Sequence, residues 1–153
     1  MSKLATFLWF ENRAEEAANF YVSIFKNSMI TSGSHPGDES ATSISFELEG
    51  QEFIAFNGGP LFPFSPATSF FVKCETQQEV DHYWESLSAA GGEQQQCGWL
   101  KDKYGITWQV VPNILGELLS DKDPAKAKRV LDAMLQMKKL EIAELMQAYN
   151  ADI

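Results

Sequence analysis

Residues 97–111 read CGWLKDKYGITWQVV, and this stretch decides how the rest of the chain is interpreted. A tight turn begins near Asp102, and Gly105 is expected to supply its positive φ. The run GITWQVV (105–111) then alternates, which predicts a β-strand. Its middle position holds a carboxamide, Gln109, where an apolar or a charged side chain is the usual choice. Gln109 therefore requires a structural or a functional reason.

The residues around this stretch predict a strand–helix–strand–strand–strand unit. ATSFFVKC (67–74) is typical of a strand, and QQEVDHYWESLSAAG (77–91) is typical of a helix that ends at a glycine. Residues 92–102 contain one strand or two. The alternating run that carries Gln109 is the last strand of the unit.

The first half of the chain predicts a similar order of elements. LATFLWF (4–10) indicates a buried strand, and AEEAANFYVSIF (14–25) indicates an amphipathic helix. Residues 32–43 are rich in Gly, Ser and Asp and predict a loop. SISFELEG (43–50) and EFIAFNGG (52–59) then predict two strands joined by a turn.

The two halves align as an internal duplication. IAFN (54–57) matches ITWQ (106–109), so that Asn57 stands opposite Gln109, a carboxamide against a carboxamide. A duplication of this length implies two packed copies that share one sheet or barrel. The boundaries we predict are a single domain over 1–153, internal modules at about 1–59 and 66–112, and C-terminal helices over 113–150.

The bulk composition excludes several classes of partner. The chain has 153 residues, 44% hydrophobic and 22% charged, which is typical of a soluble globular domain. Its net charge of -9 argues against nucleic acid and against anionic membrane surfaces, because both attract cationic faces. No stretch approaches the roughly 20 apolar residues of a membrane span.

Two cysteines, Cys74 and Cys97, are too few for a disulfide scaffold in a chain of this length. We expect both to be reduced thiols in a cytoplasmic protein, with a single bridge as the alternative. Cys97 is a nucleophile candidate without a sequence-adjacent activator. A thiol packed as a small hydrophobe is the favoured interpretation.

Seven blocks of the sequence are distinctive when taken together: LWF (8–10), AEEAANFY (14–21), FNGGP (56–60), SFFV (69–72), YWESLS (83–88), CGWLKDKYGITWQVVP (97–112) and MLQMKKLEIAEL (134–145). Together they resemble the vicinal oxygen chelate superfamily, which includes glyoxalase and extradiol dioxygenases. More closely they resemble its PhnB-like subgroup, labelled demethylubiquinone methyltransferase. The resemblance implies an α+β fold of two βαβββ modules that form a cupped, mostly antiparallel sheet. Helices lie outside it, followed by a C-terminal helical extension. It also implies a homodimer.

The resemblance also indicates which positions of this chain correspond to the metal ligands of other members. In metal-using members of the superfamily, four ligands, mostly His and Glu, come from the first and fourth strands of each module. The last ligand is commonly a glutamate four residues after the glycine of the final turn. Here that glycine is Gly105, and the matching residue is Gln109, with Asn57 as its copy in the first module.

The remaining ligand positions carry no suitable donor either. The first falls on Ala5 or Thr6, and the third falls on Ala67, with Ser69 as the next inward residue. Catalytic divalent metals favour imidazole, carboxylate or thiolate over neutral carboxamides. We therefore expect no metal and no cofactor at these positions.

Strand parity predicts which side chains line the cup. The inward face is expected to hold Phe7, Trp9, Ala55, Asn57, Ser69, Phe71, Thr107 and Gln109. The face packed on helices is expected to hold Leu8, Phe10, Ile54, Phe56, Phe70, Val72, Trp108 and Val110. Aromatic and polar residues suit a small-molecule cavity, and carboxamides orient carbonyl, amide or hydroxyl groups. The expected ligand-binding residues are Trp9, Asn57, Ser69, Phe71, Thr107 and Gln109. The alternative is that Asn57 and Gln109 only satisfy a polar core.

The favoured function is a small-molecule-binding protein or a metal-independent enzyme. The sequence does not decide whether the chain catalyses a reaction. One alternative is a metal-dependent lyase, isomerase or dioxygenase, which the missing ligands disfavour. A second is the methyltransferase of the family label, although no strand precedes a Gly-rich nucleotide loop. A third is a non-catalytic dimeric interaction module that uses its C-terminal helices.

Overall fold

The structure is a computed structural model that describes residues 2–33 and 43–151. The chain forms two compact units, Met1–Phe64 and Ser65–Ile153, and each is built on one four-stranded sheet. Most of the predicted loop 32–43, with His35 in it, lies outside the described residues. Within the described ranges, no helix is long and apolar enough to cross a bilayer.

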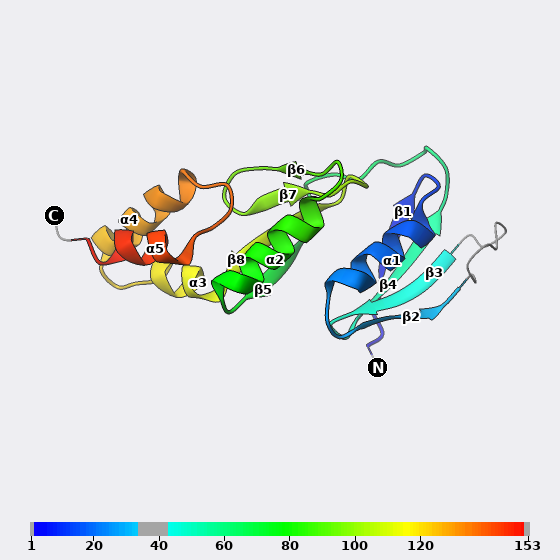
Figure 1. Ribbon diagram of the computed structural model, residues 1–153, viewed down its shortest axis with the longest axis horizontal. Helices are drawn as coiled ribbons and strands as arrows, with labels where there is room; N and C mark the ends of the chain where they lie inside the picture. The colour runs from blue at the N-terminus through cyan, green and yellow to red at the C-terminus, as the bar shows by residue number, and fades with distance from the viewer. Residues whose placement is uncertain (1, 34–42, 152–153) are drawn as a thin grey trace. The chain divides into compact units, whose positions relative to one another are not determined.

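The elements of the first unit are β1 (Thr6–Phe10), α1 (Ala14–Ile24), β2 (Ser28–Ser32), β3 (Ser43–Leu48) and β4 (Gln51–Asn57). The sheet order is β1-β4-β3-β2, with β1 and β4 parallel and the other neighbours antiparallel (Figure 1). No predicted range covers β2. Its sequence, SMITS, is short and half polar, and its register shifts between Ile30 and Ser32, so it shows no clean alternation.

Helix α1 packs on one face of this sheet. Ile44, Phe46 and Leu48 alternate along β3 and are all buried, as the sequence predicts. The chain then reverses at Glu49 and Gly50, whose φ angles are 50° and 81°. Two consecutive positive φ angles are typical of the two-residue hairpin turn whose twist matches that of the strands. The turn thereby fixes the register between β3 and β4.

The elements of the second unit are β5 (Ser69–Cys74), α2 (Gln77–Ser88), β6 (Glu93–Gln94), β7 (Trp99–Lys101), β8 (Thr107–Pro112), α3 (Asn113–Leu119), α4 (Pro124–Leu135) and α5 (Ile142–Tyr149). The sheet order is β5-β8-β7-β6, with β5 and β8 parallel. Both units therefore have the order βαβββ, which confirms the predicted α+β class and the mostly antiparallel pairing.

Helix α2 lies along one face of the second sheet (Figure 1). It starts after Thr76, whose side chain accepts a hydrogen bond from the backbone N–H of Glu79, as an N-cap does. The helix ends at Ser88, and Ala90 and Gly91 follow with positive φ angles. The glycine predicted to end the helix is therefore part of a two-residue reversal just after it.

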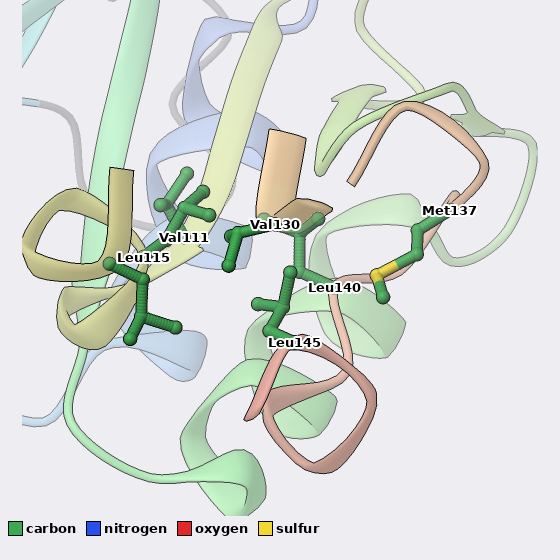
Figure 2. Close-up of a cluster of buried hydrophobic side chains, with 7 residues drawn as sticks. Val111, Leu115, Val130, Met137, Leu140 and Leu145 are labelled. Carbon is green, nitrogen blue, oxygen red and sulfur yellow. The ribbon is translucent and has the colours of Figure 1, made fainter. Parts of the chain in front are cut away.

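The C-terminal helices form a small hydrophobic core of their own with the end of β8. Asp123 caps α4 by accepting from the N–H of Ala125, and Pro124 occupies its first turn. Figure 2 shows the side chains of this core pointing toward one another. Its buried members are Val111, Leu115, Leu118, Val130, Met137, Leu140 and Leu145.

One glutamine ties this helical region to α2. The Nε2 atom of Gln77 donates to the carbonyl of Leu140 at 3.1 Å, and its Oε1 accepts from the N–H of Ile142 at 2.7 Å. Gln77 thus bonds the residues on either side of Glu141, the N-cap residue of α5. A salt bridge of 2.9 Å between Lys139 and Asp81 on α2 lies beside it.

The backbone before β7 makes a second connection. The N–H groups of Cys97 and Gly98 donate to the carbonyls of Met137 and Lys138, both at 2.8 Å. A Cβ on Gly98 would lie 2.8 Å from a backbone oxygen of Val110 and 3.0 Å from Leu140. Only glycine fits there, since its φ of 83° is also left-handed.

Candidate functional site

The strand register decides which face each predicted site residue occupies. In the second sheet, Ser69 pairs with Thr107 and Phe71 with Gln109, so these four side chains share one face. The opposite face carries the buried Val72, Trp108 and Val110 toward α2, among others. The predicted parity is therefore confirmed for this sheet. We call the side away from α2 the open face of the second sheet.

In the first sheet, part of the predicted parity is wrong. The register pairs Phe7 with Ile54 and Phe10 with Asn57. Asn57 and Ala55 therefore lie on the helix-packed face with Leu8 and Phe10, while Ile54 and Phe56 lie with Phe7 and Trp9. The predicted faces of β4 were exchanged because the alignment of 54–57 with 106–109 is shifted by an odd number of residues relative to the structure. Successive side chains of a strand point to opposite faces, so an odd shift exchanges the two faces.

Asn57 has a local structural task on the helix-packed face. Its Oδ1 accepts a hydrogen bond of 2.8 Å from the backbone N–H of Ala14, the first residue of α1. Arg13, at the N-cap position, makes no side-chain capping bond. A carboxamide from the neighbouring strand thus supplies the acceptor that the exposed N–H groups of a helix start need.

Gln109 occupies a different environment. Its side chain is half-buried on the open face, where its Nε2 donates to the Oγ of Ser69 at 3.0 Å. Across the sheet it lies between Trp99 and Phe71, its partners in the register. Within the described part of the chain its Oε1 accepts no hydrogen bond, and this oxygen is not sealed from solvent. It remains available to a ligand donor.

Thr107 lies on the same face, as predicted, but only 2% of it is exposed. Phe71 is 53% exposed, and Ser69 is half-buried. The accessible groups of the open face are thus a carboxamide with a hydroxyl partner, between two aromatic rings. Such a surface can bind a planar or apolar body and orient one polar group on it.

Trp9 lies in a separate aromatic cluster on the face of the first sheet opposite the buried Leu8 and Phe10, which we call the open face of the first sheet. Its ring centroid is 5.1 Å from that of Phe56 and 4.9 Å from that of Phe62. Its indole N–H donates to the carbonyl of Gly59 at 2.9 Å. A Cβ on Gly58 would fall 2.2 Å from the indole, so the GGP turn at 58–60 has to carry glycine there.

Asp102 is a buried carboxylate, and the sequence alone does not predict all of its contacts. Its Oδ1 accepts from the N–H groups of Tyr104 at 2.9 Å and Ile106 at 3.0 Å. Its Oδ2 accepts from the indole of Trp108 at 2.9 Å. The expected turn role is confirmed, and the bond to Trp108 adds a link from the turn to the strand that carries Gln109. A buried indole N–H needs a hydrogen-bond acceptor. This need is the only feature of the sequence that could have indicated the bond between Trp108 and Asp102.

The two cysteines are both free thiols. Cys74 is buried, and burial together with the nearby charge of Glu79 raises the pKa of its thiol to about 12. The thiolate is therefore scarce at neutral pH, which makes Cys74 a poor nucleophile. Cys97 is half-buried, and its Sγ lies 3.6 Å from the carbonyl oxygen of Met134.

The residues present do not fit a divalent metal of the kind used by relatives of this fold. Across residues 2–33 and 43–151, no group of three or more His, Cys, Asp or Glu side chains is placed to hold an ion. The position expected for a glutamate ligand carries Gln109, and Asn57, the residue matched to it in the first sheet, lies on the helix-packed face.

Comparison with solved structures supports the assignment of the fold. The PhnB protein of Bacillus cereus is 37% identical, with a TM-score of 0.65, and the alignment covers 72% of this chain and 99% of that one. A glyoxalase/bleomycin resistance protein from Albidiferax ferrireducens T118 is 14% identical (TM-score 0.51, covering 73% and 99%). The fosfomycin resistance protein FosX from Listeria monocytogenes, complexed with Mn(II), is 20% identical (TM-score 0.51, covering 71% and 89%).

The fold is thus that of the vicinal oxygen chelate superfamily, as the sequence resemblance implies. The family model for 3-demethylubiquinone-9 3-methyltransferase matches residues 2–111, and the chain belongs to that family. No curated protein matches it. The matched segment ends at Val111, so the three C-terminal helices lie outside it.

Proposed function

We propose that this chain binds a small organic molecule on the open face of its second sheet, as a binding protein or a metal-independent enzyme. Gln109 is the central contact, with Ser69 fixing its orientation and Phe71 beside it. The observation that carries the proposal is the free Oε1 of Gln109 on an exposed, partly aromatic surface. Trp9 stays in the proposal as the centre of a second aromatic surface, on the first unit.

Two predicted contacts are left out of the proposed site. Asn57 is engaged at the start of α1, and Thr107 has almost no exposed surface. The family name describes a methyltransferase, but the sequence offers no Gly-rich nucleotide loop after a strand. We therefore rest the proposal on the chemistry of the site. The cytoplasm, where thiols stay reduced, is the proposed location.

Native mass spectrometry tests this proposal on protein purified without chelator or affinity metal, followed by denaturation of the same sample. We expect an organic component that is released on denaturation. Gln109→Leu removes both polar atoms of the carboxamide while keeping a similar volume, so it should lower the occupancy at least about tenfold, which corresponds to one well-made polar contact.

The control is Gln147→Leu, the same change at an exposed position of α5. It should leave the occupancy unchanged. Bound component that survives in the Gln109→Leu protein would contradict the proposed site. A metal ion retained in stoichiometric amount would instead favour a metal-dependent enzyme.

A further inference from the structure

We infer that the ligand of this open face is an anion with an apolar body, a class that includes aromatic and aliphatic carboxylates, sulfonates and phosphate esters. This inference rests on the proposed function, because it concerns the same surface. The supporting feature is the position of two lysines, Lys73 and Lys101, around Gln109.

The register places these lysines at opposite corners of Gln109. Phe71 pairs with Gln109, and Lys73 is two residues further along β5, on the same face. Trp99 also pairs with Gln109, and Lys101 is two residues further along β7. Because β5 is parallel to β8 and β7 is antiparallel, the two lysines flank the glutamine from opposite ends. Diagonal neighbours of this kind lie about 7–8 Å apart, within reach of a lysine side chain.

Neither lysine is neutralised by an ion pair within the described residues. The one acidic side chain that the register places beside them is Glu93, which pairs with Lys101 across β6 and β7. Of the paired strand residues described around Gln109, two are therefore positive and one is negative, in a chain whose net charge is -9. A local excess of positive charge on an acidic protein attracts anions.

The open face of the first sheet has the opposite character. Glu47 and Glu52 pair across β3 and β4 there, on the same face as Trp9 and Phe56. Aromatic surface is present on both sheets, but only the second sheet combines it with lysines and a free carboxamide oxygen. The charge therefore distinguishes the two surfaces and assigns the anionic ligand to the second sheet.

Two matched fluorescent probes test this inference by titration at low ionic strength. They are the anion 1-anilinonaphthalene-8-sulfonate and the neutral N-phenyl-1-naphthylamine, which share the same ring system. Lys73→Gln and Lys101→Gln should each weaken binding of the sulfonate about three- to fivefold, as expected for an exposed charge pair. Both should leave binding of the neutral probe unchanged.

Two further variants serve as controls. Glu93→Gln removes the negative charge beside Lys101 and should strengthen binding of the sulfonate about two- to threefold. Lys122→Gln, at an exposed position outside the sheet, should change nothing. Added salt should reduce the effect of each lysine variant, because exposed charges are screened.

The outcomes separate this inference from the proposed function. If Gln109→Leu weakens binding of both probes while the lysine variants change neither, the site stands and the anionic class is wrong. If Gln109→Leu changes neither probe, or if neither probe binds the unaltered protein, the proposed function itself is contradicted. Selective loss of the sulfonate in both lysine variants supports the inference.

Discussion

Asp102 shows how one buried carboxylate in a turn can order the strand that follows it, β8. It accepts hydrogen bonds from two backbone N–H groups of its turn and from the indole of Trp108. Trp108 points toward α2, so its neighbour Gln109 must point to the open face. The contact thus helps to hold the register that exposes Gln109.

We predict that Asp102→Ala lowers the free energy of unfolding by about 2–4 kcal/mol, because it leaves a buried indole N–H and two turn N–H groups without their acceptor. Urea unfolding followed by tryptophan fluorescence measures the change. Asp132→Ala, at an exposed carboxylate paired with Lys128, should cost less than about 0.5 kcal/mol. Equal losses in both variants would refute the role assigned to Asp102.

For single residues, the sequence predicts side-chain direction correctly where apolar and polar residues alternate regularly within one strand. The prediction is wrong where the direction was inferred by matching one strand to another. The face of Gln109 follows from its own strand, since Trp108 and Val110 on either side of it are apolar. The face of Asn57 was inferred from similarity to β8, and similarity does not measure register. The hydrogen bond to Ala14 joins residues that are 43 positions apart, which no local pattern encodes.

Among the elements, α5 depends on a contact with α2 that is distant in sequence. Gln77 satisfies the carbonyl of Leu140 and the N–H of Ile142 with the two ends of one carboxamide. A short helix has marginal stability by itself, and α5 has eight residues. Its start is therefore fixed by tertiary contact more than by its own propensity.

Replacement of Gln77 by alanine should loosen α5 selectively. We predict faster amide hydrogen exchange over 137–149 and a loss of about 1–2 kcal/mol of stability, as expected for two side-chain hydrogen bonds to backbone. Exchange in β3 and β4 of the first unit should not change. The control is Gln78→Ala, since Gln78 is the exposed neighbour. Identical exchange in the two variants would show that Gln77 does not hold the helix.

The helices and most strands were predictable as elements because their patterns are long and regular. The exception is β2, whose five residues contain three hydroxyl side chains and a register shift. It forms because β3 offers an edge to pair with, a non-local cause. The N-cap at Asp123, in contrast, is predictable from the sequence because its cause is local: the residue that donates to it, Ala125, is two positions away.

For the molecule as a whole, the first unit exposes several large apolar side chains. Phe7 is 55% exposed, Met29 is 56% and Phe62 is 58%. Phe7 and Phe62 both belong to the aromatic cluster around Trp9 and Phe56. Exposed apolar patches commonly mark interaction sites.

We therefore predict a homodimer, with a mass twice the 17.1 kDa of one chain in light scattering after gel filtration. Phe7→Ser and Phe62→Ser should shift the equilibrium toward the monomer, because each removes a large apolar contact. Leu135→Ser, at a residue 50% exposed on α4, is the matched control and should leave the mass unchanged. A monomer at micromolar concentration would count against the prediction.

The backbone hydrogen bonds between residues 97–98 and 137–138 have a consequence for which parts of the chain can change in length. The family match stops at Val111, so a relative that ends there has no carbonyls in the place of Met137 and Lys138. Its two N–H groups must be hydrated or meet another acceptor. In this chain, the segment between α4 and α5 supplies both acceptors. An insertion between α4 and α5 is therefore constrained by a loop forty residues upstream, so the C-terminal helices and the βαβββ unit before them cannot vary independently.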